Sequence, residues 1–89
     1  MISEKDKNKI RDIAKQYNVK KIILFGSSID PSKESKDIDL AVEGIQHSQF
    51  FKFYGDLIFN LSKPVDIIDL TKDSRFNKIV ATEGLLLYG

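Results

Sequence analysis

The chain has 89 residues, of which 42% are hydrophobic and 30% are charged; this indicates a single folded domain over residues 1–89 and excludes a disordered chain. The formal net charge of +1 argues against nucleic acid as a general ligand, because sequence-independent binding to phosphates needs a strongly basic surface. The chain has no cysteine for disulfides or thiolate metal sites, and no apolar run approaches the roughly 18 residues of a membrane span, so we predict a cytoplasmic protein without a membrane partner.

The first predicted element is a helix from about Ser3 to Tyr17. Ser3 and Asp6 resemble a capping box, and apolar residues then recur at helical spacing on one face. The next segment, Val19–Phe25, is a short and nearly continuous apolar run that Gly26 closes, which predicts a buried strand.

A polar loop, a second strand and a second helix follow. Residues 26–36 are rich in Ser, Lys, Asp and Pro and predict a loop with at most one helical turn. Residues 37–43 begin with alternating polar and apolar side chains, as a half-buried strand does. An amphipathic helix then begins near Ser48. Its inward stripe is expected to hold Phe50, Tyr54, Leu57, Ile58 and Leu61, with Phe51 and Phe53 at the margins of the same core-facing cluster.

The last elements complete a small sheet. Residues 65–70 are rich in β-branched side chains and predict a third strand, and a helix that ends at Gly84 precedes a short strand over residues 85–88. This order of elements predicts an α+β fold, in which a small mixed β-sheet of three or four strands has helices packed on one face and the other face partly open to ligands.

The first candidate site feature is the turn Gly26-Ser27, which ends the buried strand and begins the loop. Glycine lets the backbone approach a phosphate closely, and exposed N–H groups in such a turn bind anions. Glycine and serine also dominate turns that only reverse the chain, so this feature by itself is weak evidence.

The second feature is the pair Asp37 and Asp39 on the second strand. Residues two apart on a strand point to the same face, and two adjacent carboxylates repel each other unless a cation lies between them. Carboxylates in this arrangement suit Mg²⁺, which often links protein carboxylates to substrate phosphates. The alternative is a solvated strand start, which fits the pair equally well when it is considered alone.

The third feature is Asp66, an acid within the apolar third strand. Strand propensity and the cost of desolvation both disfavour a carboxylate among β-branched residues, which indicates a functional reason for it. The alternative is an exposed strand end, a position at which the same strand also has Asp69.

These features together are much more specific than any one of them. The Gly-Ser turn, the Asp-Ile-Asp-Leu segment after nine intervening residues and the acid of the third strand resemble the signature of the DNA polymerase beta-like nucleotidyltransferase superfamily. The similarity is greatest to the minimal nucleotidyltransferases of prokaryotes, and it spans nearly the whole chain. The resemblance implies that the nucleotide phosphates are positioned by Gly26 and Ser27, that two divalent metal ions are bound by Asp37 and Asp39, and that one of these ions is shared by Asp66, which helps to activate the acceptor hydroxyl.

The same resemblance implies a function. A nucleotidyltransferase of this type transfers a nucleoside monophosphate from a triphosphate, here AMP from ATP, to an acceptor with the help of two Mg²⁺ ions. Minimal nucleotidyltransferases pair with a helical partner of the HEPN type in toxin–antitoxin systems, and some modify a tyrosine of that partner. A homo-oligomer is the other arrangement that would supply an acceptor site. Two further hypotheses are a non-catalytic antitoxin that acts by contact alone and a detached domain that serves a larger assembly.

The loop after the Gly-Ser turn departs from the family pattern. Family members often continue with Arg-Ala-Arg-Gly, whereas this chain continues with Ser28-Ile29-Asp30-Pro31 and so lacks a cation that would help to hold a triphosphate. Lys33 and Lys36 are the candidates to replace that charge. From the sequence, a Ser28→Arg substitution is expected to tighten triphosphate binding.

Overall fold

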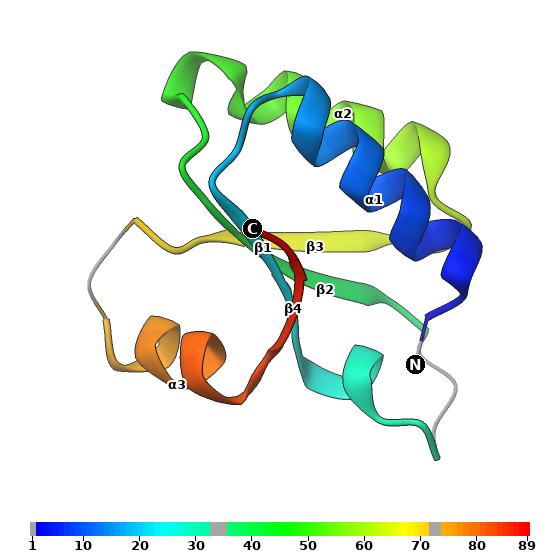
Figure 1. Cartoon of the computed structure of the whole chain (residues 1–89). Coiled ribbons are helices and arrows are strands. Elements are labelled where there is room, and N and C mark those ends of the chain that lie inside the picture. Colours follow the sequence, from blue (N-terminus) through cyan, green and yellow to red (C-terminus); the bar gives the residue numbers. More distant parts are fainter. Residues whose placement is uncertain (1, 33–35, 72–73) are drawn as a thin grey trace.

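The computed structural model describes residues 2–32, 36–71 and 74–89, which form helices around a four-stranded mixed sheet (Figure 1). In chain order the elements are α1 (Glu4–Gln16), β1 (Lys21–Leu24), the 3₁₀ turn η1 (Gly26–Ile29), β2 (Ile38–Glu43), the 3₁₀ turn η2 (His47–Gln49), α2 (Phe50–Asn60), β3 (Val65–Asp69), α3 (Arg75–Glu83) and β4 (Leu85–Tyr88). The strand order is β3-β2-β1-β4; β2 and β3 are parallel, and β1 is antiparallel to both β2 and β4. The predicted α+β fold with a mixed sheet is thereby confirmed. Within the described ranges, no helix is long and apolar enough to cross a membrane.

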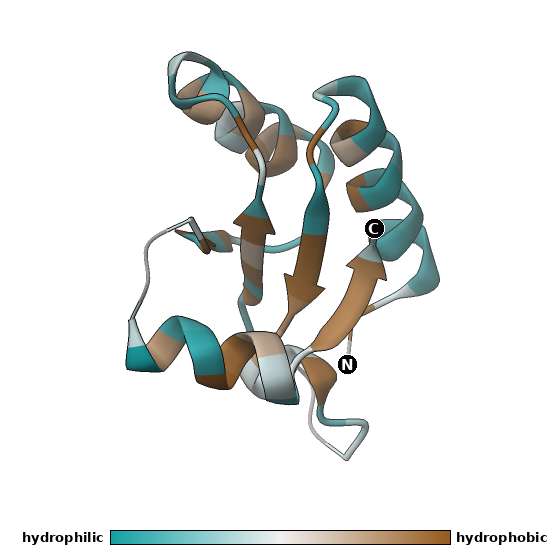
Figure 2. Cartoon of the chain, turned by 60° about the vertical axis from the view of Figure 1, so that its left-hand side comes forward, coloured by the Kyte–Doolittle hydropathy of each residue, from teal (hydrophilic) through white to brown (hydrophobic). Residues whose placement is uncertain are grey.

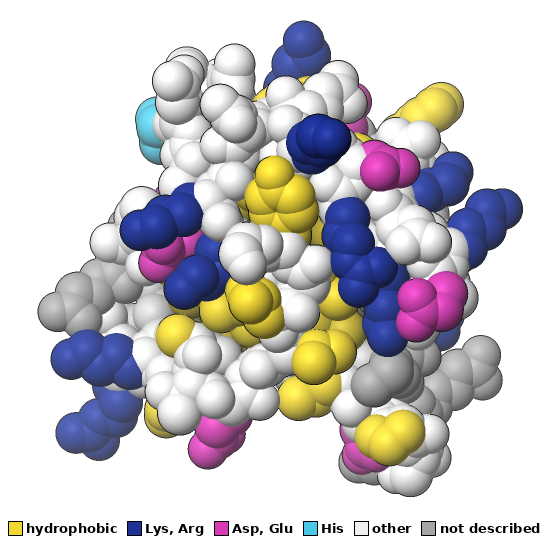
Figure 3. Space-filling view, in the orientation of Figure 1, with side chains coloured by type: hydrophobic (Ala, Val, Ile, Leu, Met, Phe, Trp, Pro, Cys, Tyr) yellow, Lys and Arg dark blue, Asp and Glu magenta, His cyan; other side chains and the backbone are white. Residues whose placement is uncertain are grey.

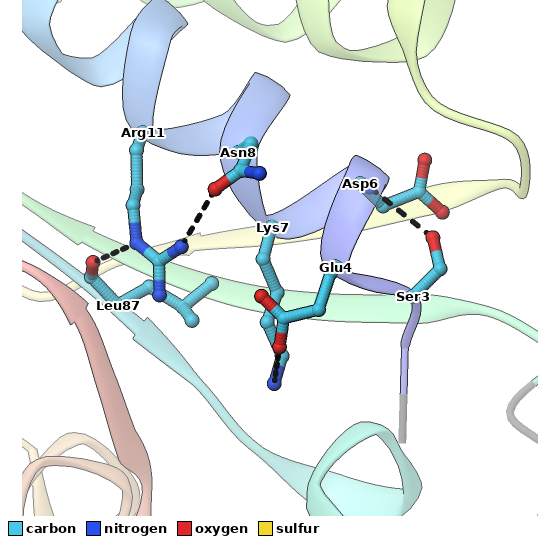
Figure 4. A network of polar contacts seen from close by, with 7 residues as sticks. All are labelled: Ser3, Glu4, Asp6, Lys7, Asn8, Arg11 and Leu87. Carbon is cyan, nitrogen blue, oxygen red and sulfur yellow. Dashed lines mark hydrogen bonds and ion pairs between the residues drawn. The ribbon is translucent and has the colours of Figure 1, made fainter.

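Helix α1 is fixed at its N-terminus and along its length by side-chain hydrogen bonds (Figure 4). The hydroxyl of Ser3 accepts a hydrogen bond from the backbone N–H of Asp6 at 3.2 Å, which satisfies one of the free donors of the first turn. Arg11 donates through Nε to the carbonyl of Leu87 at 3.0 Å and through Nη1 to Asn8 at 3.0 Å. Figure 4 shows the Arg11 side chain extending from α1 to β4, so this arginine anchors the edge strand of the sheet to the helix.

The main core lies between the sheet and the pair α1 and α2. Strand β2 turns Ile38, Leu40 and Val42 to this side, and the strands are the most hydrophobic part of the chain (Figure 2). Each fully buried side chain of this size contributes roughly 1.5–3 kcal/mol to folding. The largest fully buried hydrophobic side chains are Phe53, Ile10, Ile22, Leu24, Ile38, Leu40, Leu57 and Val42.

The opposite face of the sheet has a smaller cover. Val80 of α3 packs with Ile23 of β1 and Ala41 of β2 in a second buried cluster. The expected packing of helices on one face therefore describes α1 and α2, and α3 covers only part of the other face (Figure 1). On the side that Figure 3 presents, hydrophobic side chains are exposed down the middle. Among the large hydrophobic residues of the chain, Leu86 of β4 is 52% exposed.

The rotation of α2 differs from the one predicted from its sequence. Phe53 and Leu57 form the buried centre of the helix, whereas Ile58 is 56% exposed and Phe51 is 83% exposed. The prediction of an inward position is therefore wrong for Ile58 and Phe51. Large apolar residues occur on both sides of this helix, so their spacing does not define a single inward face.

Candidate active site

Asp39 and Asp66 lie side by side at the start of two neighbouring strands. They are the second residues of β2 and β3, and in this parallel pair their Cα atoms are register partners. Paired residues of adjacent strands project to the same face, and Leu40, the next residue of β2, points into the main core on the opposite face. The two carboxylates therefore project from the face that α3 only partly covers.

Asp37, Asp39 and Asp66 form one acidic cluster. Asp37 precedes the first residue of β2 and is exposed. The pKa of Asp39 is raised above its ordinary value of 3.8, first by burial and then by the negative charges of Asp66 and Asp37. The charges of Asp66 and Asp37 therefore lie near enough to Asp39 to act on it.

Gly26 places the turn after β1 directly against Asp39. Its φ angle is +66°, in the left-handed region that side chains disfavour. A Cβ atom at this position would lie 2.8 Å from Oδ2 of Asp39, so only glycine allows this close approach. The backbone N–H of Phe25 also donates to the carbonyl of Asp39 at 3.1 Å, which fixes the strand end beside the acid. Ser27 is exposed in the same turn.

Ser28 is a structural residue of the site that the sequence analysis missed. Its side chain is fully buried; the hydroxyl accepts a hydrogen bond from the backbone N–H of Asp39 at 3.0 Å and donates to the carbonyl of Asp37 at 3.2 Å. This single hydroxyl holds the backbone on both sides of Ile38. The sequence offered only a small polar residue in a polar loop, a signal too weak to separate it from its neighbours.

The buried position of Ser28 corrects the expectation for Ser28→Arg. A guanidinium there would lack solvent and would remove both hydrogen bonds, so the substitution disrupts the turn rather than supplying a cation for phosphates. Of the two lysines considered as replacements, Lys36 is exposed one residue before Asp37, and Lys33 lies outside the described residues.

The position of Asp66 weakens one part of the sequence argument. Asp66 is exposed, so its carboxylate does not carry the desolvation cost that was expected of an acid in a buried strand. The feature that distinguishes it from an ordinary surface acid is its register with Asp39.

The donor chemistry of the cluster fits a hard divalent cation, although its geometry is not that of a ready-made metal site. Among residues 2–32, 36–71 and 74–89, no three Asp, Glu or His side chains are grouped, as they stand, to hold a metal ion. The cluster nevertheless consists of carboxylates that repel one another, and Mg²⁺ prefers such oxygen ligands. Metal binding by Asp37, Asp39 and Asp66 stays a prediction.

A mixed sheet with acids on two parallel strands, next to a strand–Gly–Ser turn, is the arrangement expected of a nucleotidyltransferase. Residues 8–89 match the family model described as "Polymerase beta, Nucleotidyltransferase". This match covers most of the chain, so the protein belongs to that family. A comparison with curated protein sequences gives no match.

Solved structures similar to the chain are toxin–antitoxin complexes. A crystal structure of a toxin–antitoxin with AMP-PNP has a TM-score of 0.75 and 27% identity, over 93% of this chain and 73% of that one. A crystal structure of the toxin–antitoxin MntA–HepT has a TM-score of 0.72 and 25% identity, over 98% and 73%. A structure of a tri-AMPylated Shewanella oneidensis HEPN toxin in complex with an MNT antitoxin has a TM-score of 0.71 and 27% identity, over 94% and 70%. The predicted resemblance to minimal nucleotidyltransferases is confirmed by these matches.

Proposed function

We propose that the chain is a Mg²⁺-dependent nucleotidyltransferase that transfers AMP from ATP to a hydroxyl group of a HEPN-type toxin, for which it is the antitoxin. The observation that carries this proposal is the register pairing of Asp39 with Asp66 beside Gly26. It is supported by two neighbours, one a toxin–antitoxin with AMP-PNP and the other an antitoxin in complex with an AMPylated HEPN toxin.

Each site residue has a separate role in the proposed reaction. The backbone of Gly26 and the N–H groups of the turn that includes Ser27 bind phosphate oxygens, because an exposed glycine turn admits an anion to its backbone. Divalent cations would be held by Asp39 on β2 and by Asp37, which directly precedes that strand. Asp66, the register partner of Asp39, would help to hold a cation and accepts the proton of the acceptor hydroxyl.

The chemical step is an in-line displacement at phosphorus. The acceptor oxygen forms a bond to the α-phosphorus of ATP while the bond from this phosphorus to the oxygen that bridges to the β-phosphate breaks. Pyrophosphate leaves, and the hydroxyl proton passes to the carboxylate of Asp66. When bound, divalent cations would supply positive charge that offsets the negative charge of the reacting phosphate. The contribution of the chain is to hold the carboxylates in register and the phosphates against Gly26.

A second candidate function is an antitoxin that acts by contact alone. The observation that favours it is the loop after the Gly-Ser turn. Where many family members have a cation that can bind a triphosphate, this chain has Ser28, whose hydroxyl forms hydrogen bonds within the protein. This candidate keeps the HEPN-type partner and removes the transfer reaction.

One incubation separates the two functions. The purified chain is mixed with Mg²⁺, a HEPN-type protein as the candidate acceptor, and each of the four ribonucleoside triphosphates labelled on the α-phosphate. The proposed function predicts label on the partner from ATP and its loss when EDTA is added. A partner that is neutralised while no nucleotide labels it indicates the contact-only antitoxin, and label on the chain itself indicates a homo-oligomeric acceptor.

A further inference from the structure

An apolar cleft of about 290 Å³ opens beside the Gly-Ser turn, between the end of β1, the turn η1 and helix α3. Its lining is almost entirely hydrophobic and has one charged side chain. The residues that define its walls are Phe25, Gly26, Ile29, Phe76, Ile79 and Glu83.

Two large side chains of α3 leave apolar surface open in this cleft. Phe76 is 54% exposed and Ile79 is 48% exposed, whereas Val80 of the same helix is buried. The ring of Phe76 meets the ring of Phe25 edge to face, with centroids 6.0 Å apart. Exposed aromatic surface of this kind has a hydrophobic cost that a flat apolar ligand would remove.

The wall formed by α3 is held close to the sheet by Gly84. A Cβ atom at this position would lie 2.2 Å from Cγ2 of Ile23 and 2.7 Å from the carbonyl of Val80. The φ angle of Gly84 is −74°, so glycine is needed here for space and not for an unusual backbone conformation. The shape of the cleft thus follows from the packing of the end of α3 on β1.

Gly26 connects the cleft with the acidic cluster. The same residue lines the cleft and lies against the carboxylate of Asp39, with only 2.8 Å between Oδ2 and the position of a Cβ atom. A ligand with its charged end at the carboxylates can therefore pass Gly26 and place an uncharged end in the cleft. A nucleoside triphosphate is such a ligand, because its triphosphate is charged and its base is uncharged and aromatic.

The volume of the cleft fits one nucleobase. Small-molecule sites for drug-sized ligands occupy roughly 300–1,000 Å³, and the cleft lies at the lower limit of that range. Glu83 supplies one acceptor at the rim, which suits the exocyclic amine of adenine. We infer that this cleft binds the adenine ring of the nucleotide, and that Phe76 and Ile79 are its main contacts. This inference rests on the proposed function, since it assigns a place to the base of the same ATP.

A second hollow on the molecule lacks this connection. It has a volume of about 230 Å³, and its lining includes Lys21, Thr71 and Lys78 but neither Gly26 nor any member of the acidic cluster. Its lining mixes charged and polar side chains with the apolar residues Leu70 and Ala81, whereas the cleft beside the Gly-Ser turn has a single charged residue.

The test compares two ligands that share the phosphates and differ in the base. Binding of ATP and of inorganic tripolyphosphate, each with Mn²⁺, is measured by calorimetry for the wild type and for Phe76→Ala, Ile79→Ala and Phe59→Ala. Phe59 is the matched control, because it is 88% exposed on α2 and does not line the cleft. Loss of base stacking predicts about tenfold weaker ATP binding for Phe76→Ala and a smaller loss for Ile79→Ala. Tripolyphosphate affinity stays unchanged in both, and Phe59→Ala binds both ligands like the wild type.

The alternatives give different results. If tripolyphosphate binds and Phe76→Ala and Ile79→Ala keep wild-type affinity for ATP, the base lies elsewhere and the inference fails while the proposed function survives. A loss in Phe76→Ala that is equal for the two ligands, or that affects only binding of the HEPN-type partner, also overturns it. If neither ligand binds the wild type, the proposed function fails together with the inference. Magnetisation transfer between the adenine protons and the ring of Phe76 gives a direct check that does not depend on the variants.

Discussion

Asp39 of β2 and Asp66 of β3 are register partners on adjacent parallel strands, so the fold holds two carboxylates side by side on one face of the sheet. The charge of Asp66, together with that of Asp37, raises the pKa of Asp39, after the larger effect of burial. This arrangement costs free energy in the ionised form unless a bound cation offsets the repulsion. Both the repulsion between the carboxylates and its offset by a bound cation lead to effects on stability that can be measured.

The first prediction concerns stability without divalent cations. Because the pKa of Asp39 is raised from 3.8, the folded state holds its proton to higher pH than the unfolded state, and stability falls as the pH rises through this interval. Asp39→Asn removes the charge and is expected to increase the free energy of unfolding at pH 7 by less than about 1 kcal/mol, since the site is partly exposed. Urea denaturation in EDTA at pH 7 and near pH 4 measures this.

The matched control for that experiment is Asp12→Asn, which makes the same change in net charge at an exposed position of α1. A gain at pH 7 that is the same in both variants would mean that net charge, and not the acidic cluster, is responsible.

The second prediction concerns the ligand. If Mg²⁺ with ATP binds the folded state alone, as we propose, a concentration of 100 times the dissociation constant adds roughly 2.7 kcal/mol of stability. For a domain of this size the melting temperature should rise by about 10 °C or more. Asp39→Asn is expected to remove most of this rise, whereas Asp12→Asn keeps it. An equal rise in the wild type and in Asp39→Asn would place the nucleotide at another site.

The third prediction tests the close contact of the turn with Asp39. Gly26→Ala introduces a Cβ atom 2.8 Å from Oδ2 of Asp39 and at a φ angle of +66°, so it should lower the free energy of unfolding by about 1–2 kcal/mol and weaken binding of Mg²⁺ with ATP. Gly55→Ala is the control: no heavy atom lies within 4 Å of the new Cβ in the interior of α2, and helix propensity should increase stability by roughly 0.5–1 kcal/mol. Similar destabilisation in the two variants would contradict this role of Gly26.

The fourth prediction concerns the hydroxyl of Ser28. Ser28→Ala leaves the N–H of Asp39 without its acceptor in a buried position, which should cost about 1–3 kcal/mol. Ser28→Arg buries an unpaired charge and is expected to cost ~3 kcal/mol or more. Denaturant unfolding of both variants, with the exposed Ser48→Ala as control, measures the costs. If Ser28→Arg is as stable as the wild type and binds triphosphate more tightly, the cation expected from the family pattern was right and the buried role is wrong.

Local sequence signals were sufficient for most of the fold. The Ser3 cap, the β-branched run of β3 and the short strand β4 all rest on residues close together in the chain, and each is found where it was predicted. The rotation of α2 was not predictable in this way. Phe51 and Phe53 are two positions apart and chemically alike. In the folded chain Phe53 lies in the main core, with its ring centroid 5.5 Å from that of Tyr17 of α1, whereas Phe51 is exposed.

The candidate site shows the same limit. Asp37 and Asp39 were assigned to one face by their spacing, which is a local property. The register that pairs Asp39 with Asp66 depends on two strands that become neighbours only in the folded sheet. The hydrogen bonds of the Ser28 hydroxyl likewise form only when the turn after β1 packs against the start of β2. The family resemblance supplied the relation to Asp66 before the structure did, whereas nothing in the sequence indicated the role of Ser28.

The most direct test of the central claim is the transfer rate of Asp66→Asn compared with Asp69→Asn. Both replace a carboxylate of β3 by a nearly isosteric amide, but Asp69 lies outside the acidic cluster, where its carboxylate accepts hydrogen bonds from Thr71. Labelled AMP transferred from ATP to the HEPN-type partner is counted for the wild type and both variants. Loss of the proton-accepting charge should slow Asp66→Asn by at least about 100-fold, while Asp69→Asn stays within about twofold of the wild type. Transfer by Asp66→Asn at the rate of the wild type would contradict the proposed mechanism.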